Sequence, residues 1–346
     1  MSPLFARTLP LGGAALVAAV LTVAATAAPT KPKALRPGDT IMIVAPAGEL
    51  IEDRIRLAAQ RLEEMGFRVI VPDDLFRRRG YLAGTDQQRA DELMRAFTDP
   101  EVDAIFPGSG GYGVTRMLDL LDWDAIAANP KMVIGFSDIT ALHLAIAAKA
   151  GFGTFHSPNP QWGLGSDGGM PPFAAEHFWR VLLASENGGA AGVVYEQPDG
   201  LGPRVCLAGG QARGRMTGGN LSLLAALTGT PYAAQTDGAV LFLEDVREAP
   251  YRVDRMLRQL EQSGALDSPA AVVLGQFRGC DAGDDESSLT LHEVFADYFA
   301  DAPYPVVANF PAGHVEQNAT LPFGREFLVD GDTGRVELLE TPVEVD

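Results

Sequence analysis

The feature of this sequence that most constrains its fold is a repeated alternation, over residues 39–151, of short apolar runs with amphipathic segments. The apolar runs are continuous, which is typical of strands that are buried on both faces of a parallel sheet. They cover residues 39–45, 68–72, 102–106 and 131–135, and helical spacing follows at residues 51–65, 85–97, 115–123 and 138–150. This α/β pattern predicts a doubly wound parallel sheet with helices on both faces, whose ligands bind beyond the carboxyl ends of the strands.

The second half of the chain begins after residues 186–203, a stretch that is rich in Gly and Pro. That composition is typical of a domain boundary or linker. Beyond it, residues 204–346 combine strand-like apolar runs with segments of helical spacing. This half is therefore expected to be mixed α and β, although the pattern does not predict its topology.

The first 27 residues contain no acidic residue, and Arg7 is their only charged side chain. The apolar run over residues 11–25 is shorter than the roughly 20 residues that a membrane-spanning helix needs. It ends in Ala25-Thr26-Ala27, a small-x-small cleavage pattern. Residues 1–27 are therefore expected to be a secretory signal peptide, with an uncleaved N-terminal anchor as the alternative. The sequence thus predicts a periplasmic or secreted protein that has no stable membrane insertion after cleavage.

The charge balance excludes one large class of partners. The chain has 27 Lys and Arg residues against 45 Asp and Glu, which gives a formal net charge of -18. A protein that binds nucleic acid needs a basic face to neutralise phosphates, and docking on anionic lipid needs a polybasic patch. We therefore expect no nucleic-acid partner.

No metal ion or cofactor is expected from the sequence. Cys206 and Cys280 are the only two cysteines, too few for a disulfide framework or a Cys-rich zinc site, and the sequence does not decide whether they pair. His292-Glu293 has no second His at metalloprotease spacing. The acidic run over residues 281–286 does not match the spacing of an EF-hand loop.

The strongest candidate for chemistry is Ser137, in Gly135-Phe-Ser-Asp-Ile-Thr140, where an expected buried strand runs directly into a helix. A serine on a sharp strand-to-helix turn projects its hydroxyl above the sheet and places backbone N–H groups where they can stabilise an oxyanion. The motif lacks the second glycine of G-x-S-x-G. The alternative is that Ser137 only caps the helix, since serine is a preferred N-cap residue.

A glycine-rich loop, Gly108-Ser-Gly-Gly-Tyr-Gly113, follows the preceding expected strand. Glycine permits positive φ and close backbone approach, so this loop could bind phosphate or supply an oxyanion-hole N–H. Its spacing is not G-x-G-x-x-G and no Walker lysine follows, which makes a nucleotide site a weak hypothesis. A tight turn without a function is the alternative.

A nucleophilic serine needs a base, and the base needs an orienting acid. His314 lies in the loop Pro311-Ala-Gly-His314 after an expected strand, where it is free to point into a cleft. Glu244 ends the apolar run that begins at Ala239, where a carboxylate is costly unless it is paired. The alternative for Glu244 is an ion pair with Arg252 or Arg255. The other histidines are less suited to catalysis: His143, His177 and His292 lie in helical stretches, and His156 follows a short strand-like segment.

Several motifs, in order along the chain, resemble those of the LD-carboxypeptidases, which are muramoyltetrapeptide carboxypeptidases whose relatives include the microcin C immunity peptidases. In the first half they are Gly38-Asp-Thr-Ile41, Ala45-Pro-Ala-Gly48, Gly110-Gly-Tyr-Gly113 and Ile134-Gly-Phe-Ser-Asp-Ile-Thr-Ala-Leu-His143. In the second half they are Gly218-Gly-Asn-Leu-Ser222, the segment 243–255, Leu274-Gly-Gln-Phe277 and Pro311-Ala-Gly-His314. The resemblance covers roughly residues 35–340, which makes it far more specific than any single motif.

The resemblance implies a serine peptidase in which Ser137 is the nucleophile, His314 the general base and Glu244 the orienting acid. The oxyanion hole would use backbone N–H groups near Gly111 and Asp138. The implied fold is a Rossmann-like N-terminal domain, residues 35–185, and a smaller β-rich mixed C-terminal domain, residues 204–346. Members of the family are commonly dimers, so a homodimer is expected. Family substrates are peptidoglycan-derived tetrapeptides, cut before the terminal D-alanine.

Three further residues are candidates for substrate binding, and two positions depart from the family pattern. Tyr112 lies in the glycine-rich loop, while Arg252 and Arg255 could supply the local positive charge that a substrate with carboxylates needs on so acidic a protein.

Ser109 stands where the family usually has Arg, and His156-Ser-Pro158 replaces His-Gly-Pro. These departures put the details of the substrate in doubt, but not the nucleophile.

Two classes of function compete at this point. One is an exported LD-carboxypeptidase-like serine hydrolase, with an amidase or esterase acting on another acyl-amino-acid conjugate as the nearest enzymatic alternative. The other is a periplasmic binding protein that holds a peptide between two α/β domains without cutting it.

Overall fold

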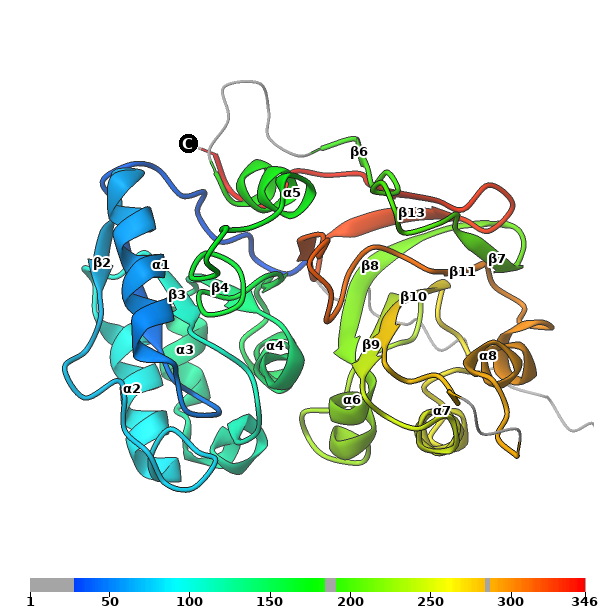
Figure 1. Cartoon of the computed structure of the whole chain (residues 1–346), viewed down its shortest axis with the longest axis horizontal. Coiled ribbons are helices and arrows are strands. Elements are labelled where there is room, and N and C mark those ends of the chain that lie inside the picture. Colours follow the sequence, from blue (N-terminus) through cyan, green and yellow to red (C-terminus); the bar gives the residue numbers. More distant parts are fainter. Residues whose placement is uncertain (1–27, 184–190, 284–286, 346) are drawn as a thin grey trace, which may run out of the picture.

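The protein, described here by a computed structural model over residues 28–183, 191–283 and 287–345, consists of two α/β halves that lie side by side (Figure 1). Each half is built around one sheet. The first half, blue to green in Figure 1, contains the expected parallel sheet, and the second half, green to red, contains a curled mixed sheet. The fold is therefore the α/β architecture with two domains that the sequence predicts. The expected signal peptide, residues 1–27, lies outside the described residues.

The first sheet has six strands in the order β12–β5–β4–β3–β1–β2. In chain order they are β1 (Thr40–Val44), β2 (Arg68–Ile70), β3 (Ala104–Pro107), β4 (Met132–Gly135), β5 (Phe155–His156) and β12 (Leu321–Pro322). Strands β1 to β5 are mutually parallel, whereas β12 pairs antiparallel with β5. The continuous apolar runs thus form buried parallel strands, as the sequence predicts.

Helices cover both faces of the first sheet. They are α1 (Glu52–Glu64), α2 (Asp86–Thr98), α3 (Trp123–Ala128), α4 (Thr140–Lys149) and α5 (Pro172–Leu182). Successive side chains of a strand point to opposite faces, so Ile41 and Ile43 of β1 pack with α1 and α5, while Met42 and Val44 pack with α2, α3 and α4. Thr85 begins α2 with a capping box that involves Gln88.

The second sheet has eight strands in the order β6–β14–β13–β8–β9–β10–β11–β7. They are β6 (Val193–Val194), β7 (Val205–Ala208), β8 (Gln211–Asn220), β9 (Val240–Val246), β10 (Ala271–Arg278), β11 (Val306–Ala308), β13 (Glu326–Asp330) and β14 (Arg335–Leu338). The central strands β8, β9, β10 and β11 are parallel, and the outer strands pair antiparallel. The second half therefore contains its own parallel unit, a topology that the sequence pattern does not predict.

Three helices connect the parallel strands of the second sheet and cover one of its faces: α6 (Leu221–Leu227), α7 (Pro250–Gln262) and α8 (Leu291–Phe299). On the opposite face, Phe242 and Phe310 pack with Phe327 and Val329 of β13. The curled sheet thus closes over its own apolar side chains. Thr290 begins α8 with a capping box that involves Glu293.

The chain does not divide cleanly between the two sheets. Strand β12, from the second half of the sequence, completes the first sheet through its pairing with β5. Residues 186–190 of the expected linker 186–203 lie outside the described residues, whereas Val193–Val194 of the same linker forms β6 of the second sheet. The domain boundaries at 185 and 204 stay a prediction.

Residues 28–35 connect the two halves at the start of the described chain. The Thr30 N–H donates to the Gly151 carbonyl of the first half, and the buried Arg325 donates to the carbonyl groups of Pro29 and Thr30 from the second. Ala34 and Glu344 are also joined by a backbone hydrogen bond of 3.0 Å. This segment therefore belongs to the fold.

The segment before α3 differs from the helix that the sequence predicts. Residues 115–123 are not one helix: two short 3-10 turns, Val114–Arg116 and Leu118–Leu120, precede α3. The Asp122 side chain caps α3 by accepting a hydrogen bond from the Ala125 N–H, which requires an extended backbone just before the helix and so ends the preceding turn.

Cys206 and Cys280 are both free thiols rather than a pair. None of the helices in the described part of the chain combines the length and hydrophobicity needed to cross a bilayer.

The two halves also meet between α4 and the end of β8. The Asn220 N–H donates to Thr140 Oγ1 at 3.0 Å, which links the residues that begin α6 and α4. Gly219 has a φ of 126°, and a Cβ there would lie 2.5 Å from Thr140 Oγ1. Only glycine lets the β8 backbone approach the Thr140 side chain this closely.

We predict that Gly219→Ala destabilises the protein by pushing α4 away from β8. Left-handed backbone at Ala costs about 1 to 2 kcal/mol, and forcing a methyl group into a packed contact costs roughly 1 to 3 kcal/mol more. Gly38→Ala is the matched control, because its φ is 99° and nothing lies within 4 Å of its added Cβ. Urea unfolding should show a larger decrease in the free energy of unfolding for Gly219→Ala than for Gly38→Ala. Equal decreases would mean that this contact does not hold the halves together.

Candidate active site

The carboxyl ends of the parallel strands in the two sheets meet in one place. Ser137 follows β4 and the glycine-rich loop follows β3, whereas Asn220, Glu244 and His314 lie at or beyond the ends of β8, β9 and β11. The contact between Asn220 and Thr140 holds these two edges together. The site therefore forms where ligands are expected for both sheets.

Ser137 occupies the sharp turn between β4 and the 3-10 turn Ser137–Ile139, which leads into α4. Its φ is 63°, a left-handed conformation that is strained for a residue with a Cβ and that is typical of a nucleophile held on a strand-to-helix turn. The capping alternative is wrong: the cap positions are Phe136 and Ile139, and neither helix start has a side-chain cap hydrogen bond. The buried His143 supports the turn through a 2.9 Å hydrogen bond from Nε2 to the Gly135 carbonyl.

The glycine-rich loop lies directly against Ser137. A Cβ on Gly110 would lie 2.8 Å from the Ser137 Cβ and 3.2 Å from the Asp138 nitrogen, so a glycine is required here to leave space in front of that N–H. Gly111 has a φ of 107°. Within the described residues, the backbone N–H groups of Gly111 and Asp138 donate to no protein acceptor. Both groups are therefore available to a ligand beside the Ser137 hydroxyl.

Two buried charged side chains fix the end of this loop. Asp138 Oδ2 accepts a hydrogen bond of 2.9 Å from the Val114 N–H, and Arg89 Nη1 donates to the Gly113 carbonyl at 2.7 Å. Arg89 is fully buried, and Asp138 is 1% exposed. Burial raises the pKa of Asp138 to about 6, against the hydrogen bond from Val114 and the charge of Arg89, which both lower it.

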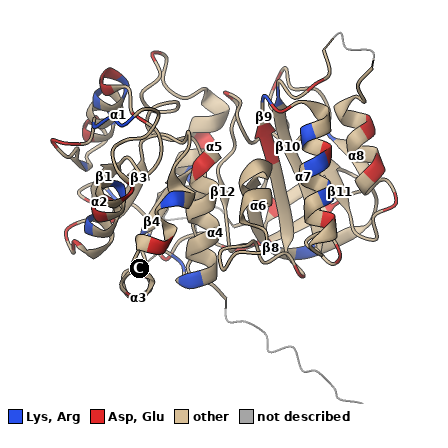
Figure 2. Cartoon of the chain, turned by 90° about the horizontal axis from the view of Figure 1, so that it is seen from below, with Lys and Arg blue, Asp and Glu red and all other residues tan. Residues whose placement is uncertain are grey.

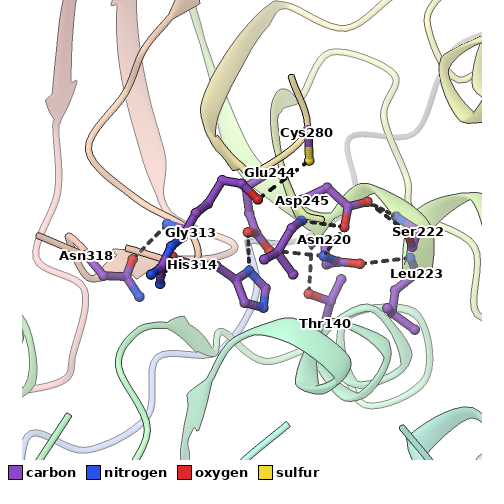
Figure 3. Close-up of polar contacts among 12 residues, drawn as sticks. Thr140, Asn220, Ser222, Leu223, Glu244, Asp245, Cys280, Gly313, His314 and Asn318 are labelled. Carbon is purple, nitrogen blue, oxygen red and sulfur yellow. Dashed lines mark hydrogen bonds and ion pairs between the residues drawn. The ribbon is translucent and has the colours of Figure 1, made fainter. Parts of the chain in front are cut away.

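His314 and Glu244 form a hydrogen-bonded pair, as Figure 3 shows. His314 Nδ1 donates to Glu244 Oε2 at 2.6 Å, and Glu244 is completely buried. Glu244 is thus paired with His314 rather than with Arg252 or Arg255. Because Nδ1 faces the carboxylate, Nε2 of the ring is left as the atom that can accept a proton.

The pair is held against the Ser137 turn. The His314 ring packs edge-on against Phe136, the residue before Ser137, with a centroid distance of 4.9 Å. Gly313 has a φ of 125°, and a Cβ on it would lie 2.9 Å from Glu244 Oε2, so the loop needs glycine to bring His314 this close. The Gly313 N–H donates to Asn318 Oδ1 at 2.9 Å, which anchors the loop from its far side. The structure therefore places the His314–Glu244 pair beside the turn that carries Ser137.

A second buried carboxylate, Asp245, supports this arrangement and is not predicted by the sequence. Asp245 Oδ2 accepts hydrogen bonds from the Ser222 N–H and hydroxyl, and Oδ1 accepts one from Asn220 Nδ2 (Figure 3). Asn220 Nδ2 also contacts Glu244 Oε1 at 3.4 Å. Burial raises the pKa of Asp245. The signal in the sequence is the acidic pair that ends the apolar strand together with Gly218-Gly-Asn-Leu-Ser222, although only the fold shows that they meet.

The expected substrate-binding side chains lie at the surface. Tyr112 is 46% exposed and its ring lies 5.8 Å from that of Tyr81. On α7, Arg252 pairs with Glu248 at 3.4 Å, and the guanidinium groups of Arg252 and Arg255 lie over the ring of Tyr251. Their role in binding a substrate stays a prediction.

Ser109 and His156, which mark the two departures from the family pattern, are both buried. Ser109 Oγ accepts hydrogen bonds from Trp162 Nε1 at 3.1 Å and from Gln161 Nε2 at 3.3 Å, so it docks the segment after β5 on the glycine-rich loop. His156 is fully buried among aromatic rings, including Phe136 and Phe242, and neither ring nitrogen has a hydrogen-bond partner in the described residues. Burial lowers the pKa of His156 well below its usual value, which keeps the ring neutral.

No group of three or more His, Cys, Asp or Glu side chains in residues 28–183, 191–283 and 287–345 is arranged to hold a metal ion. The acidic run 281–286 lies partly outside these ranges.

Comparison with known proteins places this arrangement in a family. The profile of the LD-carboxypeptidase N-terminal domain matches residues 41–157, and that of the C-terminal domain matches residues 213–329. The chain is 41% identical over 313 residues to a Streptomyces coelicolor protein named as a carboxypeptidase, covering 89% of this chain and 96% of that protein. It is 33% identical over 316 residues to the murein tetrapeptide carboxypeptidase of Pseudomonas aeruginosa, covering 89% and 98%.

Solved structures show the same likeness. The crystal structure of muramoyltetrapeptide carboxypeptidase from Oxalobacter formigenes has a TM-score of 0.75 at 30% identity, and covers 86% of this chain and 97% of that one. The Escherichia coli microcin C7 self-immunity protein MccF, in complex with aspartyl sulfamoyl adenosine, has a TM-score of 0.82 at 26% identity, covering 91% and 100%. The chain belongs to the LD-carboxypeptidase family, and it is a serine carboxypeptidase.

Proposed function

We propose that this protein releases the terminal D-alanine from peptidoglycan-derived tetrapeptides, with Ser137 as nucleophile, His314 as general base and Glu244 as orienting acid. The observation that carries the proposal is the pairing of His314 with the buried Glu244, in a loop that packs against the strained turn of Ser137. A nucleophile, a base and an acid that fixes the base are the parts that acyl transfer requires.

In the first step, His314 Nε2 takes the proton of the Ser137 hydroxyl while Ser137 Oγ attacks the carbonyl carbon of the last peptide bond. The negative charge that develops on the carbonyl oxygen is stabilised by the N–H groups of Gly111 and Asp138, which have no protein acceptor among the described residues. His314 then gives the proton to the nitrogen of the leaving D-alanine as the carbon–nitrogen bond breaks.

In the second step, water attacks the ester that joins the peptide to Ser137. His314 accepts a proton from that water and returns it to Ser137 Oγ, which restores the enzyme. Glu244 accepts a hydrogen bond from the Nδ1–H of His314 and does not take that proton, so Nε2 keeps facing the reaction and the carboxylate stabilises the positive charge that the ring carries between transfers.

The choice of substrate rests on relatives. Proteins named murein tetrapeptide carboxypeptidase and muramoyltetrapeptide carboxypeptidase resemble this chain along nearly their whole length, which favours a peptide from peptidoglycan. An amidase or esterase acting on another acyl-amino-acid conjugate would use the same catalytic parts, and a binding protein would need none of them. We also propose a homodimer, on the family resemblance alone.

We further propose that the protein is exported through residues 1–27. Cleavage after Ala27 would leave residues 28–35 intact, and these residues are hydrogen-bonded to both halves of the fold. The substrate polymer lies outside the cytoplasm, so an exported carboxypeptidase would meet it directly.

We predict that Ser137→Ala and His314→Ala each reduce D-alanine release from a muramoyl tetrapeptide by about 1,000-fold or more, because each removes a group that acts as part of one catalytic unit. Mass spectrometry of the reaction products provides the measurement. His292→Gln, a change of an exposed histidine on α8, is the control and should keep wild-type activity. Release by Ser137→Ala at the wild-type rate would exclude the proposed nucleophile.

We predict that Asp138→Asn changes how stability depends on pH. The pKa of Asp138 is raised from 3.8 to about 6 in the folded protein, so the folded state holds this proton more tightly than the unfolded chain does. Ionisation therefore costs stability as the pH rises from about 4 to 6, and the neutral amide avoids that cost while it still accepts from Val114. Between pH 4 and pH 7, the unfolding free energy of Asp138→Asn should rise by on the order of 2 to 3 kcal/mol relative to that of wild type. A difference in unfolding free energy that is constant across this range would contradict the assignment.

We predict that a bacterial host exports the full-length chain and that the exported protein begins at residue 28. N-terminal sequencing and mass measurement of the periplasmic fraction test this expectation. A variant that lacks residues 1–27 should stay in the cytoplasm with the same unfolding temperature after purification. Recovery of the full-length chain in the membrane fraction, still beginning at Met1, would instead support the uncleaved anchor.

A further inference from the structure

Two exposed arginines lie at the ends of neighbouring strands, and one of them, Arg278, contacts the loop that carries His314. Arg278 is the last residue of β10, and Arg247 follows β9. The Arg247 N–H donates to the Arg278 carbonyl at 2.8 Å, and Arg278 Nη1 donates to the carbonyl oxygen of His314 at 3.4 Å. The guanidinium group of Arg278 is thus held at the loop that carries the base, on the edge of the sheet where the site lies.

No carboxylate among the described residues forms an ion pair with either arginine. Within the described residues, neither Arg278 nor Arg247 lies within ion-pair distance of an Asp or Glu, whereas Arg252 on α7 is paired with Glu248. The chain has a net charge of -18, and its acidic residues include Glu244 and Asp245 on β9, the red segment of that strand in Figure 2. A free cation beside an acidic site is what an anionic ligand would need there.

We infer that Arg278 binds the terminal carboxylate of the peptide substrate, and that Arg247 adds to the positive potential around it. This inference rests on the proposed function. The nitrogen that His314 protonates is attached to the carbon that bears the terminal carboxylate, so the carboxylate must lie close to His314. A guanidinium group presents paired N–H donors that match the two oxygens of a carboxylate.

This assignment accounts for the removal of only the last residue of a peptide. In a longer peptide, or in one with a blocked end, a neutral amide would lie beside Arg278 in place of the carboxylate. The guanidinium group would then give up part of its hydration without gaining an ionic partner. Arg278 would therefore act as a specificity residue that selects a free C-terminus, while Ser137, His314 and Glu244 carry out the bond cleavage.

The inference is tested with two substrates that differ only at the C-terminus: a tetrapeptide that ends in D-alanine with a free carboxylate, and the same peptide that ends in D-alanine amide. We expect wild type to prefer the free acid. Arg278→Gln should lower kcat/KM for the acid by about 10- to 100-fold, mainly through a higher KM, because a charge-assisted hydrogen bond is lost in the bound substrate and the transition state alike. The same change should alter kcat/KM for the amide by less than about threefold, since the amide makes no ionic contact.

The matched control is Arg258→Gln, which removes one positive charge from an exposed arginine of α7 that is paired with Glu261. Arg258→Gln should leave the ratio of kcat/KM for the acid to kcat/KM for the amide unchanged. A reversal of charge gives an independent readout: Arg278→Glu should cleave a peptide whose terminal residue carries a positively charged aminoethyl amide better than wild type does. A merely structural role for Arg278 does not produce that gain.

The outcomes separate this inference from the proposed function. If wild type releases D-alanine and Arg278→Gln keeps the wild-type preference for the free acid, Arg278 does not bind the carboxylate. Arg278→Gln could instead lower kcat/KM equally for the acid and the amide and also slow the labelling of Ser137 by a small uncharged phosphonate. That result would show that Arg278 supports the fold of the site. If wild type cleaves neither peptide, the proposed function fails and the inference fails with it.

Discussion

A carboxylate that is completely buried must have a partner, and Glu244 at the end of β9 finds it in His314. The pairing fixes the His314 side chain across 70 residues of sequence, and the surrounding structure is arranged to allow it. Gly313 leaves space for the Glu244 oxygen, Asn318 anchors the loop, and Asn220 contacts the second oxygen of Glu244. The orientation of His314, and with it the chemistry proposed for the site, depends on this one buried contact.

The proposed nucleophile, Ser137, comes from the other half of the protein, so the proposed catalytic residues meet only when the two sheets are docked. The β8 backbone contacts the Thr140 side chain at this junction: Gly219 lies against it, and the Asn220 N–H donates to the Thr140 hydroxyl. The same Asn220 also contacts Glu244 and Asp245 through its side chain. Asn220 therefore links α4, the helix that follows Ser137, to the carboxylate of Glu244. A shift between the halves would move Ser137 relative to His314, which acyl transfer does not tolerate.

Much of this site could be predicted from the sequence because its parts have local signals. A buried strand that runs into Gly-Phe-Ser-Asp predicts a sharp turn with an exposed hydroxyl, and an apolar strand that ends in Glu244 predicts a carboxylate that needs a partner. Ordered motifs then assigned His314 to that partner through resemblance to a family. The structure shows His314 paired with Glu244 and packed against Phe136, the residue before Ser137, and it shows that Ser137 is strained rather than a helix cap.

Other features have no local signal. Strand β12 is two residues long, so it has no periodicity, yet it completes the first sheet through a pairing that depends on the whole fold. Asp138 and Arg89 read as ordinary helical residues, and only their burial shows that they hold the glycine-rich loop. Arg278 is one of several arginines in the second half, and its place beside His314 follows from the bridge between Gln276 and Gly313. Contacts between segments distant in the sequence decide each of these.

The central claim is that Ser137 is a nucleophile activated by the His314–Glu244 pair. It is tested most directly by treating the wild-type protein with a serine-reactive phosphonate and mapping the modified residue by mass spectrometry. The account predicts a single adduct on Ser137, formed far more slowly when His314 or Glu244 is replaced by Ala or Gln. An adduct on another serine, or labelling of Ser137 at the same rate in these variants, would contradict it.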